Sequence, residues 1–547
     1  MYKKYLLLLL ILAFSLVIRL WLLDKVPSAS LYGDELTEVY DSYSILKTGY
    51  SQTGDFLPWT FKMAEGRPPG YVYFSIPFVS LFGPSILGAR MLSVLSGIGI
   101  VLLMFYLGKL LVNQRLGYVA AFLTAISPWG IHISRGGFET NFALFLTLLG
   151  IVTFLQSKIK VWLLIVSAIS FALAIHTYPT YKLTVPLMVL FLIFYTRAHL
   201  WLIRKGTFLV ASIFLIIMVG AIGMVLMQAL LFGSESRILN INIFNQDKLR
   251  EEIIQKINYD VTIDQLSSNS IKKLLHNKPL EYSFIVGENY LQSFSLNFLF
   301  LHGDTNPRHN PATMGELYLI EFILIVSGLF FLFKTRNNYL RLIIFWLLIA
   351  PLPAAIISEP HALRDSLMLP PLLILSSAGL VFLWDLFKSK KLIWLNYLLL
   401  LLILVQFIIF VDRYFFIAPS AFSRFWSYPA KLAVETVQLN KDKFDYIILS
   451  DSLDNIEYAY PVYIKIDPNL VIAQNKQKTN LEQYQFKNFG NVYIGHIPDG
   501  EIDEFITTLS GSVLYIGPIE EKKSLTSFEV VKGLDTLPAF IVKKKLL

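Results

Sequence analysis

The chain has 547 residues, of which 55% are apolar and 16% are charged, with no cysteine and a formal net charge of +8. Soluble domains carry about a quarter charged residues, so this composition excludes a wholly water-soluble globular protein. The high apolar content also excludes an intrinsically disordered chain. The absence of cysteine excludes a disulfide scaffold, a thiolate zinc site, an iron–sulfur cluster and a cysteine nucleophile.

Apolar runs long enough to cross a membrane occur along most of the first 412 residues. A hydrocarbon core about 30 Å thick needs roughly 17–25 helical residues at 1.5 Å per residue. We predict about eleven membrane-spanning helices, over 5–23, 85–111, 117–131, 138–156, 161–176, 183–196, 207–232, 316–334, 340–357, 366–387 and 392–412. The first contains Arg19 and is interpreted as a signal anchor. A twelfth run, 69–83, contains Pro77 and ends at Gly83-Pro84, so we interpret it as an interfacial helix.

Basic residues predict the orientation of these helices. If Lys3 and Lys4 are cytoplasmic, every second loop is cytoplasmic too, and these loops contain no aspartate or glutamate. Their basic residues are Lys109, Arg115, Lys158, Lys160, Arg197, Arg204, Lys205, Lys334, Arg336, Arg341, Lys388, Lys390 and Lys391. The positive-inside rule therefore predicts a cytoplasmic N-terminus in a cell membrane. The net positive charge then belongs to the inner membrane face, and we expect no nucleic-acid partner.

The predicted extracytosolic side consists of five loops and a C-terminal region. The loops are 24–68, 132–137, 176–182, 233–315 and 358–365. After residue 412, strand-like runs alternate with polar helical stretches, and we predict strands at 446–449, 491–494, 513–516, 528–531 and 540–542. The fold class is thus a multi-pass α-helical transmembrane domain over 1–412, followed by a small extracytosolic α/β domain over 413–547.

The first outer loop carries the adjacent carboxylates Asp34 and Glu35 near its start and Arg67 near its end. Carboxylates just beyond a span are candidates for a general base or for ligands of a hard metal ion. The alternative is an ordinary helix start, where acidic residues interact favourably with the helix dipole. Arg67 is a candidate for a charge-assisted contact with a phosphate, or for a contact with ordinary lipid headgroups.

Two further clusters lie at predicted outer helix ends. Arg135 and Glu139 are four residues apart, which indicates either an i,i+4 ion pair or a phosphate-binding arginine beside a second site carboxylate. Tyr178, Tyr181 and Lys182 are typical of an interfacial aromatic belt, or of a sugar-binding wall.

The last two clusters combine histidine, arginine and aspartate. Asp304, Arg308 and His309 lie in a turn-rich segment of the large outer loop, and His361 and Arg364 lie in the turn 358–365. Such groups bind phosphate or sugar hydroxyls, although a solvated turn or a headgroup contact would use the same residues.

All these clusters fall on one membrane face in a topology derived only from lysines and arginines. Together they indicate a site for an anionic, membrane-embedded substrate. The sequence contains no Walker A motif, no dinucleotide-binding fingerprint, no HExxH and no GxSxG. Because ATP and nucleotide sugars are not supplied outside the cytoplasm, a transfer reaction there needs a pre-activated donor. A polyprenyl-phosphate sugar meets this requirement.

Short motifs with a recognisable order support this interpretation. They are Arg19-Leu20-Trp21, Asp34-Glu35, Arg67-Pro68-Pro69, Ala89-Arg90-Met91-Leu92-Ser93, Ser127-Pro128-Trp129 and Ser134-Arg135…Glu139. Over residues 5–200 the chain resembles the family 39 glycosyltransferases of the GT-C fold, which include protein O-mannosyltransferases and aminoarabinose transferases. The segments 303–309 and 361–364 are similar to those of bacterial members. We find no resemblance for 413–547.

The resemblance implies a polyprenyl-phosphate-sugar donor and transfer with inversion to a lipid, glycan or protein acceptor. It places Asp34 at the reaction centre, with Glu35 as its neighbour and Glu139 as a second acidic residue. Some relatives hold a divalent metal with these carboxylates, so Asp34 and Glu139 are candidate metal ligands, and no other cofactor is implied. We assign the leaving phosphate to Arg67, Arg135, Arg308 and Arg364. The other candidate substrate-binding residues are Tyr178, Tyr181, Lys182, Asp304, His309 and His361.

Two other functions fit a polytopic membrane protein. A lipid or sugar transporter usually has ionisable groups near the membrane centre, whereas the charges here lie toward the ends of the predicted spans. A sensor or scaffold would use 413–547 as its receptor domain and would not need Asp34.

Overall fold

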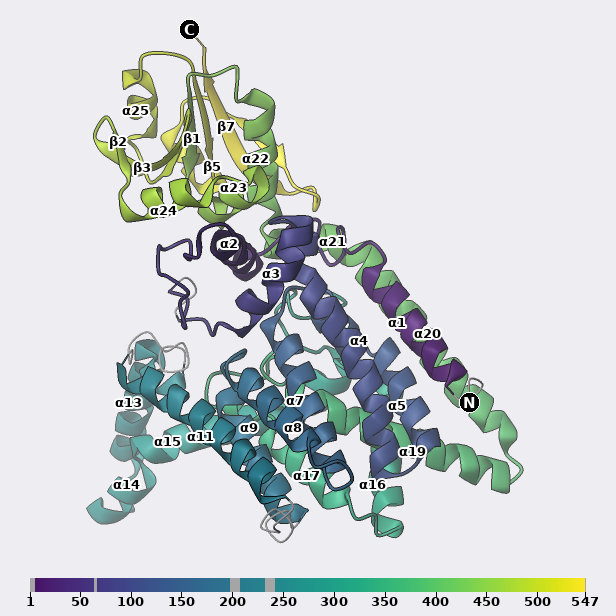
Figure 1. The fold of residues 1–547 in the computed structure, drawn as a ribbon. Helices are drawn as coiled ribbons and strands as arrows, with labels where there is room; N and C mark the ends of the chain where they lie inside the picture. The colour runs from purple at the N-terminus through teal and green to yellow at the C-terminus, as the bar shows by residue number, and fades with distance from the viewer. Residues whose placement is uncertain (1–4, 63–65, 197–206, 232–241, 547) are drawn as a thin grey trace.

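The computed structural model describes residues 5–62, 66–196, 207–231 and 242–546, and it consists of a long helical bundle with a sheet domain at one end (Figure 1). A helix covers most of each predicted membrane-spanning run. These helices are α1 (Leu6–Leu20), α4 (Ile86–Leu111), α5 (Gln114–Ile126), α7 (Glu139–Gln156), α8 (Leu163–Ile175), α9 (Tyr181–Tyr195), α11 (Phe208–Leu231), α16 (Leu319–Lys334), α17 (Leu340–Ile349), α19 (Leu369–Ser389) and α20 (Ile393–Val411).

Within the described residues, five helical segments have the length and apolar composition of a complete span. They are Ile86–Leu111, Glu139–Gln156, Phe208–Gln228, Ser366–Ser389 and Ile393–Ala421. Several of the others are shorter because proline interrupts the backbone hydrogen bonds of a helix. The predicted span 340–357 is one example, since α17 ends before Pro351 and the short α18 (Leu352–Ala355) follows. The protein is a multi-pass membrane protein, and the number of spans stays a prediction.

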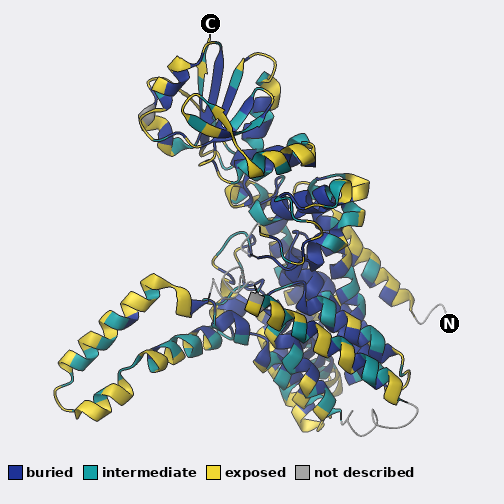
Figure 2. Cartoon of the chain, turned by 60° about the vertical axis from the view of Figure 1, so that its left-hand side comes forward, coloured by how far each residue is buried: buried dark blue, intermediate teal, exposed yellow. Residues whose placement is uncertain are grey.

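The remaining helices of this part connect or flank the bundle. The predicted interfacial helix is α3 (Gly70–Phe82), and the first outer loop contains α2 (Gly33–Thr48). A short α6 (Pro128–Ile133) follows α5. The large loop forms α13 (Asp247–Ile263), α14 (Asn269–Leu275) and α15 (Lys278–Gln292), which project sideways from the bundle and expose much of their surface (Figure 2).

Close packing of α16 against α19 shows how small residues hold the bundle together. A Cβ atom added at Gly328 would clash with the backbone carbonyl of Leu375, and one added at Gly379 would clash with that of Leu324. Glycines facing each other let two helix backbones approach closely, which gains dispersion energy that lipid-exposed surfaces cannot provide. These two glycines therefore set the distance between α16 and α19.

The C-terminal region forms a seven-stranded mixed sheet in the order β2-β3-β4-β1-β5-β7-β6. The strands are β1 (Tyr446–Ser450), β2 (Thr479–Leu481), β3 (Tyr484–Phe489), β4 (Val492–Gly495), β5 (Val513–Gly517), β6 (Glu529–Lys532) and β7 (Pro538–Lys545). β1 pairs in parallel with β4 and β5, and the other pairs are antiparallel. Helices α22 (Tyr428–Asn440), α23 (Ile456–Ile464), α24 (Pro468–Lys476) and α25 (Ile502–Thr508) pack on this sheet. The predicted strands are present, whereas β2 and β3 were not predicted.

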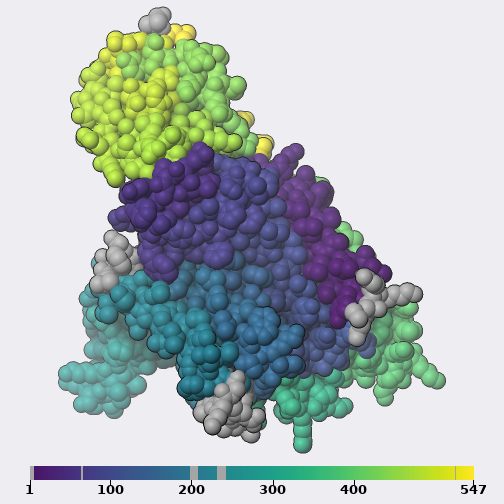
Figure 3. Space-filling view, in the orientation of Figure 1, coloured from purple at the N-terminus to yellow at the C-terminus, as the bar shows by residue number. Residues whose placement is uncertain are grey.

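The sheet domain rests on α2 and the chain before it (Figure 3). Tyr40 donates its hydroxyl proton to the carbonyl of Ile466, and the Tyr463 hydroxyl accepts from the amide of Leu31. Apolar residues of α2 belong to the same hydrophobic core as α22, α23 and β1. The domain therefore fixes the position of α2 relative to the bundle.

We predict that Gly328→Val destabilises the protein by about 1–3 kcal/mol, because the added side chain must push α19 away from α16. Gly220→Val is the matched control, since a Cβ at Gly220 meets no atom within 4 Å. Thermal unfolding of the detergent-solubilised protein measures both changes. Equal melting temperatures for the two variants would contradict the proposed close contact.

Candidate active site

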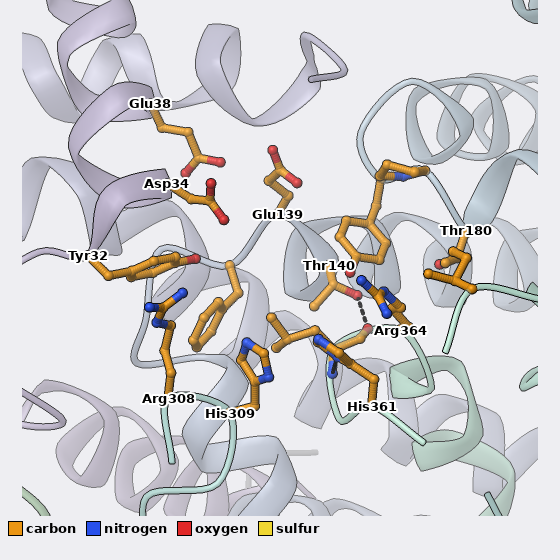
Figure 4. A pocket seen from close by; sticks show the side chains of 15 residues that line it. Tyr32, Asp34, Glu38, Glu139, Thr140, Thr180, Arg308, His309, His361 and Arg364 are labelled. Carbon is orange, nitrogen blue, oxygen red and sulfur yellow. Dashed lines mark hydrogen bonds between the residues drawn. The ribbon is translucent and has the colours of Figure 1, made fainter. Parts of the chain in front are cut away.

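A cavity of about 180 Å³ lies at the end of the bundle that carries the sheet domain. Five separate segments form it: the start of α2, the start of α7, the connection between α8 and α9, and the loops around residues 308 and 361 (Figure 4). Its lining residues are Tyr32, Asp34, Glu38, Phe138, Glu139, Thr140, Tyr178, Pro179, Thr180, Arg308, His309, Ile357, His361, Leu363 and Arg364. Four of the five predicted outer loops and the start of the predicted span 138–156 thus meet in one place.

Three carboxylates form one wall of this cavity (Figure 4). Asp34 and Glu38 are four residues apart on α2 and therefore share a helix face, while Glu139 is the first residue of α7. The guanidinium of Arg67 lies between them, with Nη2 at 2.7 Å from Asp34 Oδ1 and Nε at 2.9 Å from Glu139 Oε1 and 3.4 Å from Glu38 Oε1. We call Asp34, Glu38, Glu139 and Arg67 the acidic cluster.

Arg67 differs from its predicted role. Its side chain is only 1% exposed and does not line the cavity, and Nη1 also donates to Thr37 Oγ1 at 3.0 Å. A guanidinium held by three carboxylates has no charge to offer a phosphate, so we correct that assignment. Arg67 also occupies the space between Asp34 and Glu139 that a metal ion held by both carboxylates would need.

The three carboxylates are not equivalent. Asp34 is the most accessible, with 36% of its side chain exposed, whereas Glu38 is fully buried. Burial raises the pKa of Glu38 well above its usual value, and the negative charges of Glu139 and Asp34 add to this rise while Arg67 opposes it. Asp34 is therefore the carboxylate that a substrate can reach most easily.

Glu35 does not belong to the cavity, which corrects the prediction that it neighbours Asp34 at the reaction centre. Successive residues of a helix point about 100° apart, so Glu35 faces the bundle when Asp34 faces the cavity. It is fully buried and accepts two hydrogen bonds from Arg90, at 2.8 and 3.1 Å, and one from the amide of Gly137 at 2.7 Å. Glu35 therefore ties α2 to α4 and to the start of α7.

Basic and aromatic side chains form the opposite wall (Figure 4). The Arg308 guanidinium lies over the Tyr32 ring at 4.8 Å, and its Nε donates to the carbonyl of Phe425 at 2.9 Å. Arg364 donates to Ser358 Oγ at 2.6 Å. His309 and His361 lie between the two arginines, with ring centres 4.2 Å apart. The guanidinium groups of Arg308 and Arg364 therefore line the side of the cavity across from the acidic cluster.

Asp304 lies behind the two histidines and does not line the cavity. Its Oδ2 atom is 3.3 Å from His309 Nδ1 and 3.8 Å from His361 Nδ1, and it accepts a hydrogen bond from the amide of Ala362 at 2.8 Å. Burial lowers the pKa of His361 well below its usual value, so this imidazole is neutral at physiological pH.

Of the remaining predicted site residues, only Tyr178 lines the cavity. Arg135 is buried and donates to the carbonyls of Ile18, Arg19, Trp21 and Val26, so it anchors the end of α1 instead of binding phosphate.

Two further predicted residues at the start of α9 are also absent from the cavity lining. Tyr181 is buried with its hydroxyl 3.1 Å from Ser366 Oγ. Lys182 donates to Gln228 Oε1 at 3.4 Å. We therefore correct the substrate-binding assignments of Arg135, Tyr181 and Lys182.

Four polar cavity residues were not predicted: Tyr32, Glu38, Thr140 and Thr180. Glu38 had a usable signal, because a carboxylate four residues after Asp34 lies on the same helix face. Thr140 follows Glu139 directly, and its hydroxyl is 2.7 Å from Ser366 Oγ. The positions of Tyr32 and Thr180 depend on how loops approach each other, which no local pattern encodes.

Comparisons with known proteins agree with this architecture. Residues 66–223 match the profile of the dolichyl-phosphate-mannose-protein mannosyltransferase family, which confirms the family resemblance over this part of the chain. No curated protein matches the sequence.

Solved structures are similar over almost the whole chain. The crystal structure of ArnT from Cupriavidus metallidurans in the apo state has a TM-score of 0.57 at 12% identity, covering 98% of this chain and 97% of that one. The same enzyme bound to undecaprenyl phosphate has a TM-score of 0.55 at 11% identity, with the same coverage. At this identity the similarity establishes the fold, and the chain has the GT-C fold.

We predict that Glu38→Gln changes how stability depends on pH. Because the pKa of Glu38 is raised on folding, the folded state keeps a proton that the unfolded state releases above about pH 4.5, so this group's contribution to stability falls as pH rises. A glutamine side chain at this position does not titrate. The melting temperature of the variant relative to the wild type should therefore increase steadily from pH 5 to pH 8.

A difference in melting temperature that stays constant with pH would contradict a raised pKa for Glu38. Asp24→Asn is the control, since Asp24 is an exposed acid of the same loop.

Proposed function

We propose that this protein is a membrane glycosyltransferase that moves a sugar from a polyprenyl-phosphate donor to an acceptor on the extracytosolic face, with inversion at the sugar carbon. The observation that carries the proposal is the cavity with an acidic wall and a cationic wall, in a chain with the GT-C fold and a match to the mannosyltransferase family profile. ArnT, which shares the fold, has been solved with undecaprenyl phosphate.

The acidic wall suits the acceptor hydroxyl of such a reaction, and the cationic wall suits the leaving phosphate. The acceptor oxygen forms a bond to the sugar C1 while the bond from C1 to the phosphate oxygen breaks, and the electron pair of that bond leaves with the lipid phosphate. Asp34 takes the hydroxyl proton of the acceptor, since it is the accessible carboxylate and Arg67 fixes its orientation. Arg308 and Arg364 compensate the charge on the leaving phosphate.

The size of the cavity and its surroundings support a lipid-linked monosaccharide as the donor substrate. A cavity of about 180 Å³ suits one sugar ring better than a long glycan. A second, apolar cavity of about 740 Å³ lies between α15 and α18 and is lined by Phe244, Tyr282, Leu352 and Ile356. Ile356 of this cavity precedes Ile357 of the first cavity in the chain, so we propose that the apolar cavity holds part of the polyprenyl tail.

The positions of basic residues support an extracytosolic site. Lys109 and Arg115 lie at the junction of α4 and α5, at the bundle end opposite the sheet domain, where Arg115 pairs with Asp385 at 2.7 Å (Figure 1). By the positive-inside rule this end is cytoplasmic. The N-terminus is then cytoplasmic, and the cavity and the sheet domain face the outside of the cell membrane.

We predict that Asp34→Asn lowers sugar transfer by about 10²–10⁴-fold, the usual effect of removing a general base. Membranes containing the variant are supplied with radiolabelled polyprenyl-phosphate mannose or aminoarabinose, and label in lipid, glycan and protein fractions is counted. Asp24→Asn is the matched control, because Asp24 is exposed in the same loop. Full transfer by a normally folded Asp34→Asn variant would remove Asp34 from the mechanism.

The same preparation distinguishes an enzyme from a lipid or sugar transporter. Reconstituted wild-type protein that moves the labelled lipid across liposomes without forming a glycosidic bond would favour the transporter.

We predict that Arg308→Gln and Arg364→Gln each weaken binding of undecaprenyl phosphate roughly tenfold to a hundredfold, because a charge-assisted hydrogen bond contributes about 1.5–3 kcal/mol. Displacement of the radiolabelled lipid from purified protein measures this. Arg413→Gln is the control, since Arg413 is exposed and donates to the carbonyl of Thr313. Equal affinity of all three variants would place the phosphate elsewhere.

A further inference from the structure

Three potential metal ligands converge on the cationic wall of the cavity. Asp304, His309 and His361 each offer one ligand atom, and these atoms all lie within 4.8 Å of one another. His309 and His361 line the cavity, whereas Asp304 lies behind them. The three residues come from two loops, so only the fold brings them together. We call them the Asp304 triad.

The distances in the Asp304 triad are close to those of a zinc site. Zinc bonds of about 2.0–2.1 Å in a tetrahedral arrangement place neighbouring ligand atoms about 3.3 Å apart. Asp304 Oδ2 is 3.3 Å from His309 Nδ1 and 3.8 Å from His361 Nδ1. All three ligand atoms lie within 4.8 Å of one another, so shifts of at most about 1.5 Å would bring them to bonding distance from one central ion.

The hydrogen bonds around the triad leave one buried imidazole nitrogen, His309 Nδ1, available to a ligand. His309 Nδ1 is buried and has no hydrogen-bond partner among the described residues, although it lies near the Asp304 carboxylate. His361 Nδ1 accepts from the amide of Leu363 at 3.2 Å, so this nitrogen carries no proton. Because an imidazole nitrogen has a single lone pair, an ion would bind His361 through Nε2 or replace this hydrogen bond from Leu363.

The main chain holds Asp304 in place for such a role. Oδ2 accepts from the amide of Ala362 and Oδ1 from that of Asn306, both at 2.8 Å. The amide of Asp304 in turn donates to the buried Glu316 at 3.0 Å. Ligands oriented by surrounding hydrogen bonds are typical of metal sites, where these bonds fix geometry and tune affinity.

We propose that Asp304, His309 and His361 bind a divalent zinc-type ion whose fourth coordination position opens into the cavity. Two imidazoles and one carboxylate match a zinc site with an open position, while magnesium and calcium prefer oxygen ligands only. This moves the candidate metal site from Asp34 and Glu139, where Arg67 already supplies the cation, to the opposite wall. That the open position takes an oxygen of the donor phosphate rests on the proposed function.

Metal content of the full-length protein tests the site without any sugar donor. Detergent-solubilised protein is stripped with a chelator, incubated with zinc chloride and desalted, and zinc is measured by elemental analysis. We expect about one zinc ion per chain in the wild type, falling below about a tenth in Asp304→Asn, His309→Ala and His361→Ala. His302→Ala is the matched control, because His302 is an exposed histidine of the same loop and should keep the ion.

X-ray absorption at the zinc edge of the wild type gives a readout that does not depend on the variants folding. Scattering from two imidazoles and one carboxylate supports the site, whereas scattering without imidazole overturns it. Absence of zinc in the wild type, or its retention in the three triad variants, also overturns it. Loss of zinc in Glu139→Gln would assign the ion to the acidic cluster instead.

The two proposals fail in different ways. Zinc bound by the triad in a protein that transfers no sugar would refute the proposed function and leave the metal site intact. Sugar transfer by a wild-type protein that binds no zinc would refute the metal site alone.

Discussion

The pairing of one buried arginine with three carboxylates is the interaction on which the site depends. Removing an ion from water costs several kcal/mol, so Arg67 is tolerable at 1% exposure only because Asp34, Glu38 and Glu139 surround it. Burial, together with the negative charges of Glu139 and Asp34, in turn raises the pKa of Glu38, while Arg67 opposes this rise. This balance links α2, the start of α7 and the segment before α3, and Asp34 is the most accessible of the three carboxylates that line the cavity.

The sheet domain contributes to the site through α2 and the segment that follows the last span. Its core includes apolar residues of α2, and the Tyr40–Ile466 hydrogen bond joins the two directly. Arg308 also depends on a residue just before this domain, because its Nε donates to the carbonyl of Phe425. A change in the position of the sheet domain relative to the bundle would therefore move α2, which carries Asp34 and Glu38. It would also move Arg308, which lies on the cationic wall.

Hydropathy predicts the helices well because it is a local property, but the partners of charged residues depend on the tertiary fold. Sequence alone could place Asp34 and Glu139 at one face of the membrane, and both line the cavity. It could not show that Glu35 turns toward Arg90, or that Arg135 anchors α1 through backbone carbonyls. An arginine near a predicted site has several partners within reach, and only packing selects among them.

The separation of the two walls gives the proposed reaction a direction. A phosphate beside the acidic cluster would be repelled, since three carboxylates there surround a single guanidinium. In the proposed reaction the phosphate then lies on the side of Arg308 and Arg364. In this proposal the sugar would lie between the walls, and its acceptor would approach from the side of Asp34, opposite the leaving phosphate. A single displacement in this arrangement requires inversion, because attacking and leaving oxygens occupy opposite faces of the sugar carbon.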